Sequence, residues 1–167
     1  TDSASPTCSG GTDTVQKKWR GTSGSDVDIA GVETKNTGSD ITNHPNYRGD
    51  VNTAAAVAHA SIDSDSAADW CNDLSYGGYT DWYLPARSEM AHLLCYGNTS
   101  AYDSNYPNQS ANCTAWGGKG SGLTGFATTD YYATSTEYDS SSVWIQRFST
   151  GSDSVTVPKS NDSFAVS

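Results

Sequence analysis

The chain has 167 residues, the length of one domain with a sizeable core, and 19 acidic residues against 9 basic ones give it a net charge of −10. This charge repels phosphate backbones and sulfated polysaccharides, so nucleic acid and heparin-like glycans are poor candidate partners. No apolar run approaches the ~20 residues of a membrane-spanning helix, and we expect no membrane insertion. Hydrophobic residues make up only 35%, but five Trp and ten Tyr predict a core built from aromatic rings.

The first third of the sequence is dominated by residues that favour loops. Residues 1–14 are rich in Ser, Thr, Gly and Asp and are expected to form a linker or tether, which leaves residues 15–167 as a single domain. A short strand is predicted over residues 15–19, with Trp19 packed inside. Residues 21–52 place isolated apolar side chains among Gly, Ser, Thr, Asn and Asp, and this pattern predicts short strands and long loops.

A first helix is predicted over residues 64–74, where Ser64 or Ser66 can cap the N-terminus. Its buried stripe has helical spacing and comprises Ala67, Trp70, Cys71 and Leu74. Its outward face carries Asp65, Asp69 and Asp73. The nearby His59 suggests a metal site together with these acids, but a solvated helix face explains them better, and we assign no metal.

A turn, a strand and a second helix follow one another in residues 77–95, GGYTDWYLPARSEMAHLLC. Residues 81–84 predict a short buried strand, and Pro85 ends it before a helix over residues 86–94. Glu89 lies in the first turn of that helix, where the helix dipole favours an acid. The apolar side of the helix carries Met90, Leu93 and Leu94.

The last part of the chain predicts one long loop and then a series of strands. Residues 96–126 are polar and lack a regular pattern, and loops of this length are usually functional, disordered or pinned covalently. Strands are predicted between Ser-rich turn clusters, at residues 131–135, 143–148, 155–157 and 164–166.

The sequence has four cysteines, none of which lies in a Cys-x-x-Cys pair or at zinc-ligand spacing from a His. An even count in a chain rich in Ser, Gly and Tyr predicts two disulfides in an oxidising compartment. Cys95 ends the second helix and Cys113 follows the polar loop, so we pair these two and leave Cys8 with Cys71. The alternative is that the thiols are free and buried.

Residues 60–167 carry several motifs in a fixed order. The first has the form GGY-x-DW and comprises Gly77, Gly78, Tyr79, Asp81, Trp82, Leu84, Pro85, Arg87, Glu89, Met90 and Leu93. Downstream come YATSTE at residues 132–137, VWIQRF at residues 143–148 and a final stretch from Lys159 to Val166. Together these motifs resemble the C-terminal domain of Lcl-type collagen-like adhesins, a family within the C-type lectin-like folds.

The resemblance implies an α+β, C-type lectin-like fold with two helices, short antiparallel strands and long loops, and a ligand-facing region at about residues 96–164. It implies a protein displayed outside a cell or on a virion that binds a protein or glycan ligand on another cell or virion. The acidic charge argues against the sulfated glycans that Lcl-type adhesins bind. The alternative is a structural head of a fibre or pilus without specific recognition.

We expect no catalysis and no cofactor. No Gly-x-Ser-x-Gly motif is present, and none of the three His lies in a recognisable catalytic motif. The calcium-binding triplets of true C-type lectins are also missing from the sequence, so nothing assigns a metal ion.

The C-terminal region, residues 128–164, is rich in Ser, Thr, Asp, Asn and Tyr, the residue types that antibody paratopes use. Related variable proteins are diversified by retroelements, which implies a variable binding face here. Its candidate ligand-binding residues are Tyr132, Thr134, Tyr138, Asp139, Ser141, Gln146, Arg147, Ser152, Asp153 and Thr156. The residues expected to hold the scaffold are Trp82, Leu84, Trp144 and Phe148. The alternative is that the polar residues form only a solvated β surface.

Overall fold

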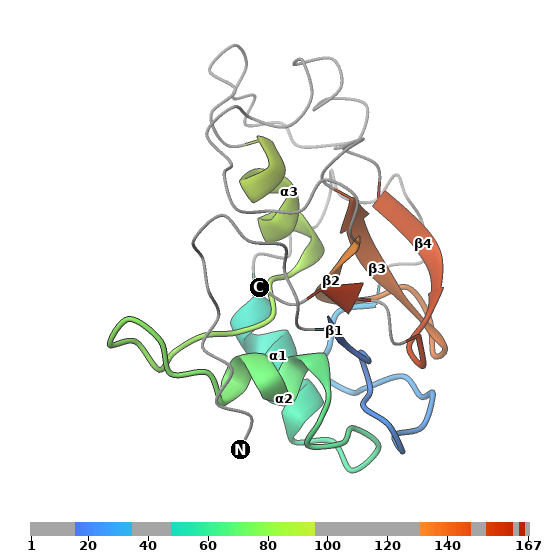
Figure 1. Ribbon diagram of the computed structural model, residues 1–167. Helices are drawn as coiled ribbons and strands as arrows, with labels where there is room; N and C mark the ends of the chain where they lie inside the picture. Colours follow the sequence, from blue (N-terminus) through green and yellow to red (C-terminus); the bar gives the residue numbers. More distant parts are fainter. Residues whose placement is uncertain (1–15, 35–47, 96–130, 148–152, 162–163, 166–167) are drawn as a thin grey trace.

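The computed structural model describes residues 16–34, 48–95, 131–147, 153–161 and 164–165. In this part of the chain, three helices are gathered on one side of a five-stranded sheet (Figure 1). The expected α+β class is therefore confirmed. None of the described helices has the length and hydrophobicity needed to cross a membrane. The predicted linker at residues 1–14 and the predicted loop at residues 96–126 lie outside the described residues.

Helix α2 (Ala67–Asn72) forms where the first helix was expected, within residues 64–74. Its N-cap is Ser66, whose Oγ accepts a hydrogen bond from the backbone N–H of Asp69 at 3.1 Å. Ala67 and Cys71 are buried, as the helical stripe predicts. The cap and the apolar stripe therefore specify this helix locally.

Helix α3 (Arg87–Cys95) begins just after Pro85, as predicted. Glu89 lies in its first turn, and its Oε2 accepts a hydrogen bond from the backbone N–H of Ala86 at 2.8 Å. Met90 is buried, whereas Leu93 is exposed, so only part of the predicted apolar side faces the core.

Helix α1 (Gly49–Val57) has no counterpart among the predicted helices. Its buried face is made by Gly49, Asn52, Thr53 and Ala56. Because none of these is a large apolar residue, the face leaves no hydrophobic period in the sequence. Asn52 is buried with its Oδ1 accepting from Glu33 N at 3.1 Å and its Nδ2 donating to Ser135 Oγ at 3.2 Å.

The sheet has the strand order β1-β5-β2-β3-β4. Its strands are β1 (Gln16–Lys17), β2 (Tyr131–Glu137), β3 (Ser142–Arg147), β4 (Asp153–Pro158) and β5 (Phe164–Ala165). β2 and β5 run parallel, and the other neighbours are antiparallel. The strands predicted at residues 15–19 and after residue 128 are thus confirmed. Pairing of β1 with β5 joins the first and last described parts of the chain.

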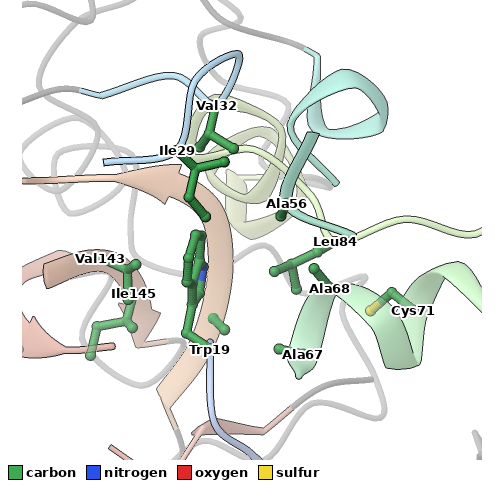
Figure 2. Packing of buried hydrophobic residues seen from close by; sticks show 11 residues of the cluster. Trp19, Ile29, Val32, Ala56, Ala67, Ala68, Cys71, Leu84, Val143 and Ile145 are labelled. Atoms are coloured by element: carbon green, nitrogen blue, oxygen red, sulfur yellow. The ribbon is translucent and has the colours of Figure 1, made fainter. Parts of the chain in front are cut away.

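Trp19 lies at the centre of the hydrophobic core (Figure 2). Val143 and Ile145 of β3 pack on one side of its ring, and Leu84 lies on the other side. Its indole Nε1 donates a hydrogen bond to the carbonyl oxygen of Thr134 at 2.8 Å. Most of the remaining members of the cluster are small or β-branched residues from α1, α2 and the segment before α1, so this cluster is less aromatic than expected.

The predicted buried strand at residues 81–84 is wrong. This segment pairs with no strand among the described residues, and both Trp82 and Tyr83 are exposed. Leu84 alone is buried, and its backbone is bound by a side chain instead of a strand. Its N–H donates to Thr53 Oγ1 at 3.0 Å, and that hydroxyl donates back to the Leu84 carbonyl at 3.2 Å.

Cys71 is a free, buried thiol, so the predicted disulfide with Cys8 is wrong for this structure. The side chain packs in the core cluster on the inner face of α2. Burial raises the pKa of the Cys71 thiol to about 12. Cys8, Cys113 and the side chain of Cys95 lie outside the described residues.

Candidate functional site

A buried ion pair joins two of the sequence motifs. Lys159 Nζ lies 2.5 Å from Glu137 Oε1, and both side chains are 0% exposed. The ammonium group also donates to the Val27 carbonyl at 2.6 Å and lies 5.1 Å from the centroid of the Trp19 ring. Burial raises the pKa of Glu137, and the hydrogen bond and charge of Lys159 oppose this shift.

The second oxygen of Glu137 is also occupied. Its Oε2 accepts hydrogen bonds from Ile29 N at 3.2 Å and from Thr34 Oγ1 at 3.3 Å. The carboxylate therefore connects β2 to the segment before α1, while Lys159 brings in the chain after β4. These contacts use both motif residues to hold the scaffold, which leaves neither one accessible to a ligand.

The hydroxyl groups of β2 are likewise used inside the molecule. Thr134 Oγ1 donates to the Trp144 carbonyl at 2.9 Å, and Thr136 Oγ1 accepts from Arg87 N at 3.0 Å. The guanidinium Cζ of Arg87 lies 3.3 Å from the centroid of the Trp144 ring, so the start of α3 is packed onto β3. The Ser/Thr-rich motif at residues 132–137 is therefore an interior strand.

Three of the predicted ligand-binding residues are buried in this strand pair. Tyr132 and Thr134 are each 1% exposed and Gln146 is 2% exposed, so the expectation that they face a ligand is wrong. β2 lies between β5 and β3 in the sheet, and α1 and α3 contact it as well. Every residue of β2 after Tyr131 is buried, so the strand has no solvent side on which alternate polar residues could lie.

The remaining predicted site residues fall into two groups. Tyr138, Asp139 and Ser141 lie in the turn between β2 and β3, where Asp139 Oδ1 accepts from Ser141 N at 2.8 Å. This backbone hydrogen bond, with others in the turn, lowers the pKa of Asp139. Outside the described residues lie Ser152 and the side chains of Arg147, Asp153 and Thr156.

The four residues expected to hold the scaffold have different outcomes. Leu84 and Trp144 are buried, as predicted, whereas Trp82 is exposed and its assignment to the scaffold is wrong. Phe148 lies outside the described residues.

The exposed part of the first motif is a projecting turn with its flanking residues, 76–83, which we call the aromatic hairpin. Tyr76 and Tyr79 exchange two backbone hydrogen bonds, each of 3.0 Å. Between them Gly77 and Gly78 have φ angles of 63° and 86°, and two successive positive φ values are what a tight primed hairpin turn requires. The segment extends away from the body of the domain between α2 and α3 (Figure 1).

Three aromatic rings of the hairpin face solvent. Tyr79 is 64% exposed, and Trp82 and Tyr83 are each 41% exposed. The Trp82 ring lies 6.4 Å from that of Tyr76, and the Tyr83 hydroxyl donates to Glu89 Oε1 at 3.3 Å. Gathered exposed aromatic rings of this kind mark interaction surfaces.

The base of the hairpin is fixed where α1 and α3 meet. Glu89 Oε2 accepts hydrogen bonds from both Ala86 N at 2.8 Å and Gly49 N at 3.2 Å. The contact at Gly49 is so close that an added Cβ would lie 2.7 Å from Ala86 N and 2.7 Å from the Leu84 carbonyl. The rings therefore project from a rigid junction, which is the property that a preorganised binding surface needs.

The surroundings of the hairpin are acidic. Residues 49–86 contain six Asp and no Lys or Arg. At the edge of this stretch Arg48 pairs with Asp50 at 2.9 Å. Burial, followed by the charge of Glu89, raises the pKa of Tyr83. Burial, followed by the charges of Asp73 and Asp65, likewise raises the pKa of Asp69. The acidic residues around α2 therefore disfavour a further negative charge beside them.

Residues 30–166 match the family model of the Lcl C-terminal domain, which is most of the chain. The chain belongs to the Lcl C-terminal domain family. A search of the curated proteins and a search of the solved structures each found no match. The resemblance noted in the sequence is thereby confirmed at the level of the family.

The motifs of this Lcl C-terminal domain thus serve two purposes. Those in the C-terminal third, with Glu137 and Lys159, lie inside the scaffold, whereas the GGY-x-DW motif forms an exposed hairpin. Only the Gly-Gly pair next to aromatic residues indicates this exposure in the sequence.

Among the described residues no group of three or more His, Cys, Asp or Glu could hold a metal ion. His59 accepts a hydrogen bond at Nδ1 from Ser61 N at 3.2 Å.

Proposed function

We propose that this Lcl C-terminal domain is a non-enzymatic ligand-binding module displayed outside a cell or on a virion, and that it contacts its ligand through the aromatic hairpin. The observation that carries the proposal is the exposure of Tyr79, Trp82 and Tyr83 on a tight turn with a fixed base. Rigid aromatic side chains supply large contact areas at low cost in conformational entropy, because only two side-chain torsions become ordered.

A C-type lectin-like arrangement of the whole domain is part of the proposal. Membership of the Lcl family and the mixed α+β architecture support it. An experimental structure of the full domain, superposed on C-type lectin-like folds, tests this part independently of the ligand.

The turn between β2 and β3 is the part of the predicted variable face that stays in the proposal. Ser141 is exposed there, and Tyr138 and Asp139 are half-buried. Retroelement diversification would act on this turn without disturbing the interior of β2. A reverse-transcriptase gene and a near-identical template repeat beside this gene are what that proposal expects.

The hairpin is tested in a binding screen against cell surfaces and immobilised glycans. We expect the variant Tyr79→Ser/Trp82→Ser to lose at least about tenfold in affinity, because anchoring aromatic residues dominate interface energies. Its melting temperature should stay within about 2 °C of the wild type, since both side chains are exposed.

The matched control is the variant Asp139→Ala/Ser141→Ala, which changes two residues of the turn between β2 and β3 and leaves the hairpin unchanged. Loss of binding by this variant alone would move the site to the β2–β3 turn. Retention of binding by both variants would contradict the hairpin, and failure of the wild type to bind any surface would favour the structural-head alternative.

A further inference from the structure

We infer that the ligand of the aromatic hairpin is a cationic polypeptide segment, one that carries several Lys or Arg side chains. This inference rests on the proposed function, because it takes the hairpin as the binding surface. It adds the chemistry of the partner, which the sign and placement of the charges around the rings determine.

The first step is the one-sided charge of the surface that bears the hairpin. Residues 49–86 form α1, α2 and the hairpin and contain six Asp without a single Lys or Arg. Two of the six are already bound to the segment before α1: Asp65 accepts from Thr22, and Asp63 accepts from Ser23. A third, Asp50, is paired with Arg48. The remaining carboxylates are those of Asp69 in α2, Asp73 directly after α2 and Asp81 in the hairpin.

The two arginines that border this stretch leave the charges of Asp69, Asp73 and Asp81 in place. Arg48 is held by Asp50 through two hydrogen bonds, of 2.9 and 3.1 Å. Arg87 is buried with its guanidinium group against the Trp144 ring. Lys18 lies beside the start of α2, where its carbonyl accepts from Ala67 N at 2.9 Å. Beside the rings themselves lie two carboxylates, the exposed Asp81 and Glu89, which binds the Tyr83 hydroxyl.

The rings supply the second step. A Lys or Arg group over an exposed Trp or Tyr face gains about two- to fivefold in affinity, and a neighbouring carboxylate adds to this attraction. Trp82 and Tyr83 offer two separate contacts, since Trp82 packs beside Tyr76 and Tyr83 bonds to Glu89. A single small cation covers one of these contacts, whereas a chain with spaced cations covers both together with Asp81.

Charge also argues against other occupants. A second copy of this chain carries the same net charge of −10 and is repelled, and anionic glycans and nucleic acids are repelled for the same reason. A neutral glycan is not repelled, but its binding would not depend on salt. Salt dependence therefore separates the cationic peptide from a sugar.

The test uses the whole chain and a short fluorescent peptide that alternates Lys and Gly, with a matching peptide of Glu and Gly. We expect the Lys peptide to bind and the Glu peptide not to bind, with weaker binding at about 0.15 M ionic strength than at low salt. Trp82→Ala should weaken binding about two- to fivefold, and Tyr79→Ala/Trp82→Ala about tenfold.

Two charge-matched variants decide whether the attraction is local. Asp81→Asn removes a carboxylate from an exposed position next to Trp82 in the hairpin, and Asp28→Asn removes one from an exposed position in the segment before α1. We expect Asp81→Asn to weaken binding at least about twofold and Asp28→Asn to have a smaller effect. Equal effects of the two variants, binding that ignores salt, or binding of the Glu peptide would overturn the inference.

The result is distinguishable from a failure of the proposed function. If Tyr79→Ser/Trp82→Ser abolishes binding to cell surfaces while the Lys peptide is ignored, the hairpin remains the binding surface and its partner is not cationic. If the Lys peptide binds with the predicted variant pattern, both proposals are supported.

Discussion

Lys159 keeps a charged group inside the protein, and its environment explains how this is tolerated. Glu137, the Val27 carbonyl and the Trp19 ring surround the ammonium group. Removing two charges from water is costly, and their attraction offsets that cost only when further hydrogen bonds satisfy the remaining atoms. Those bonds come here from Ile29 and Thr34. The pair therefore stabilises one arrangement of three chain segments.

Breaking this pair should be strongly destabilising. Lys159→Met leaves Glu137 buried without its cation, and we expect a loss of about 3–5 kcal/mol in the free energy of unfolding, measured with urea. Lys18→Met makes the same change at a half-buried position and should stay within about 0.5 kcal/mol. Lys159→Met/Glu137→Gln should be more stable than Lys159→Met. If Lys159→Met is as stable as the wild type, the Lys159–Glu137 pair has no structural role.

Cys71 gives the molecule a pH dependence in the alkaline range. The folded-state pKa of about 12 lies above the ordinary value of 9.0, so between these values the folded protein binds more protons than the unfolded chain. Stability should therefore fall as pH rises above about 9, by up to about 1.4 kcal/mol per pH unit. The stability difference between the wild type and Cys71→Ala, measured at several pH values, should narrow over this range. A constant difference would contradict the buried thiol.

At the scale of the elements, what could be predicted depended on whether a local signal existed. α2 was predictable because Ser66 caps it and Ala67 and Cys71 fit an apolar stripe. α1 was not, because its buried face carries Asn52 and Thr53, whose burial depends on hydrogen bonds to distant residues. Residues 81–84 are predicted as a buried strand because Trp82 and Tyr83 resemble buried strand residues. In the structure only Leu84 is buried, because its backbone binds the distant Thr53 and not a neighbouring strand.

The junction of α1 with the hairpin base leads to a prediction at Gly49. Alanine normally favours a helix over glycine by about 1 kcal/mol, yet its Cβ here would lie 2.7 Å from two backbone atoms. We therefore expect Gly49→Ala to lose about 1–3 kcal/mol in urea unfolding. Val51→Ala, at an exposed position of the same helix, should change stability little. A more stable Gly49→Ala variant would show that the junction is loose.

At the scale of the whole molecule, the acidic surface and the sheet come from different parts of the sequence. The acidic stretch at residues 49–86 forms the surface that bears the hairpin, whereas the C-terminal motifs form the sheet and part of the core. The family motifs in the sequence therefore located part of the scaffold, at Leu84 and Trp144, but placed Trp82 in it and the candidate site in the C-terminal strands. Composition predicted the polar strand to be a recognition face, because Ser and Thr occur equally in exposed surfaces and in hydrogen-bonded interiors.

The interior position of the Ser/Thr-rich β2 has a practical consequence for engineering. A combinatorial library built on this domain would lose most of its members to misfolding if the codons for residues 132–137 were randomised. Diversity placed at residues 139–141, or at Tyr79 and Thr80 next to the Gly-Gly turn, would instead fall on solvent-facing positions or turns. The domain thus offers two short segments for directed evolution on a fixed frame.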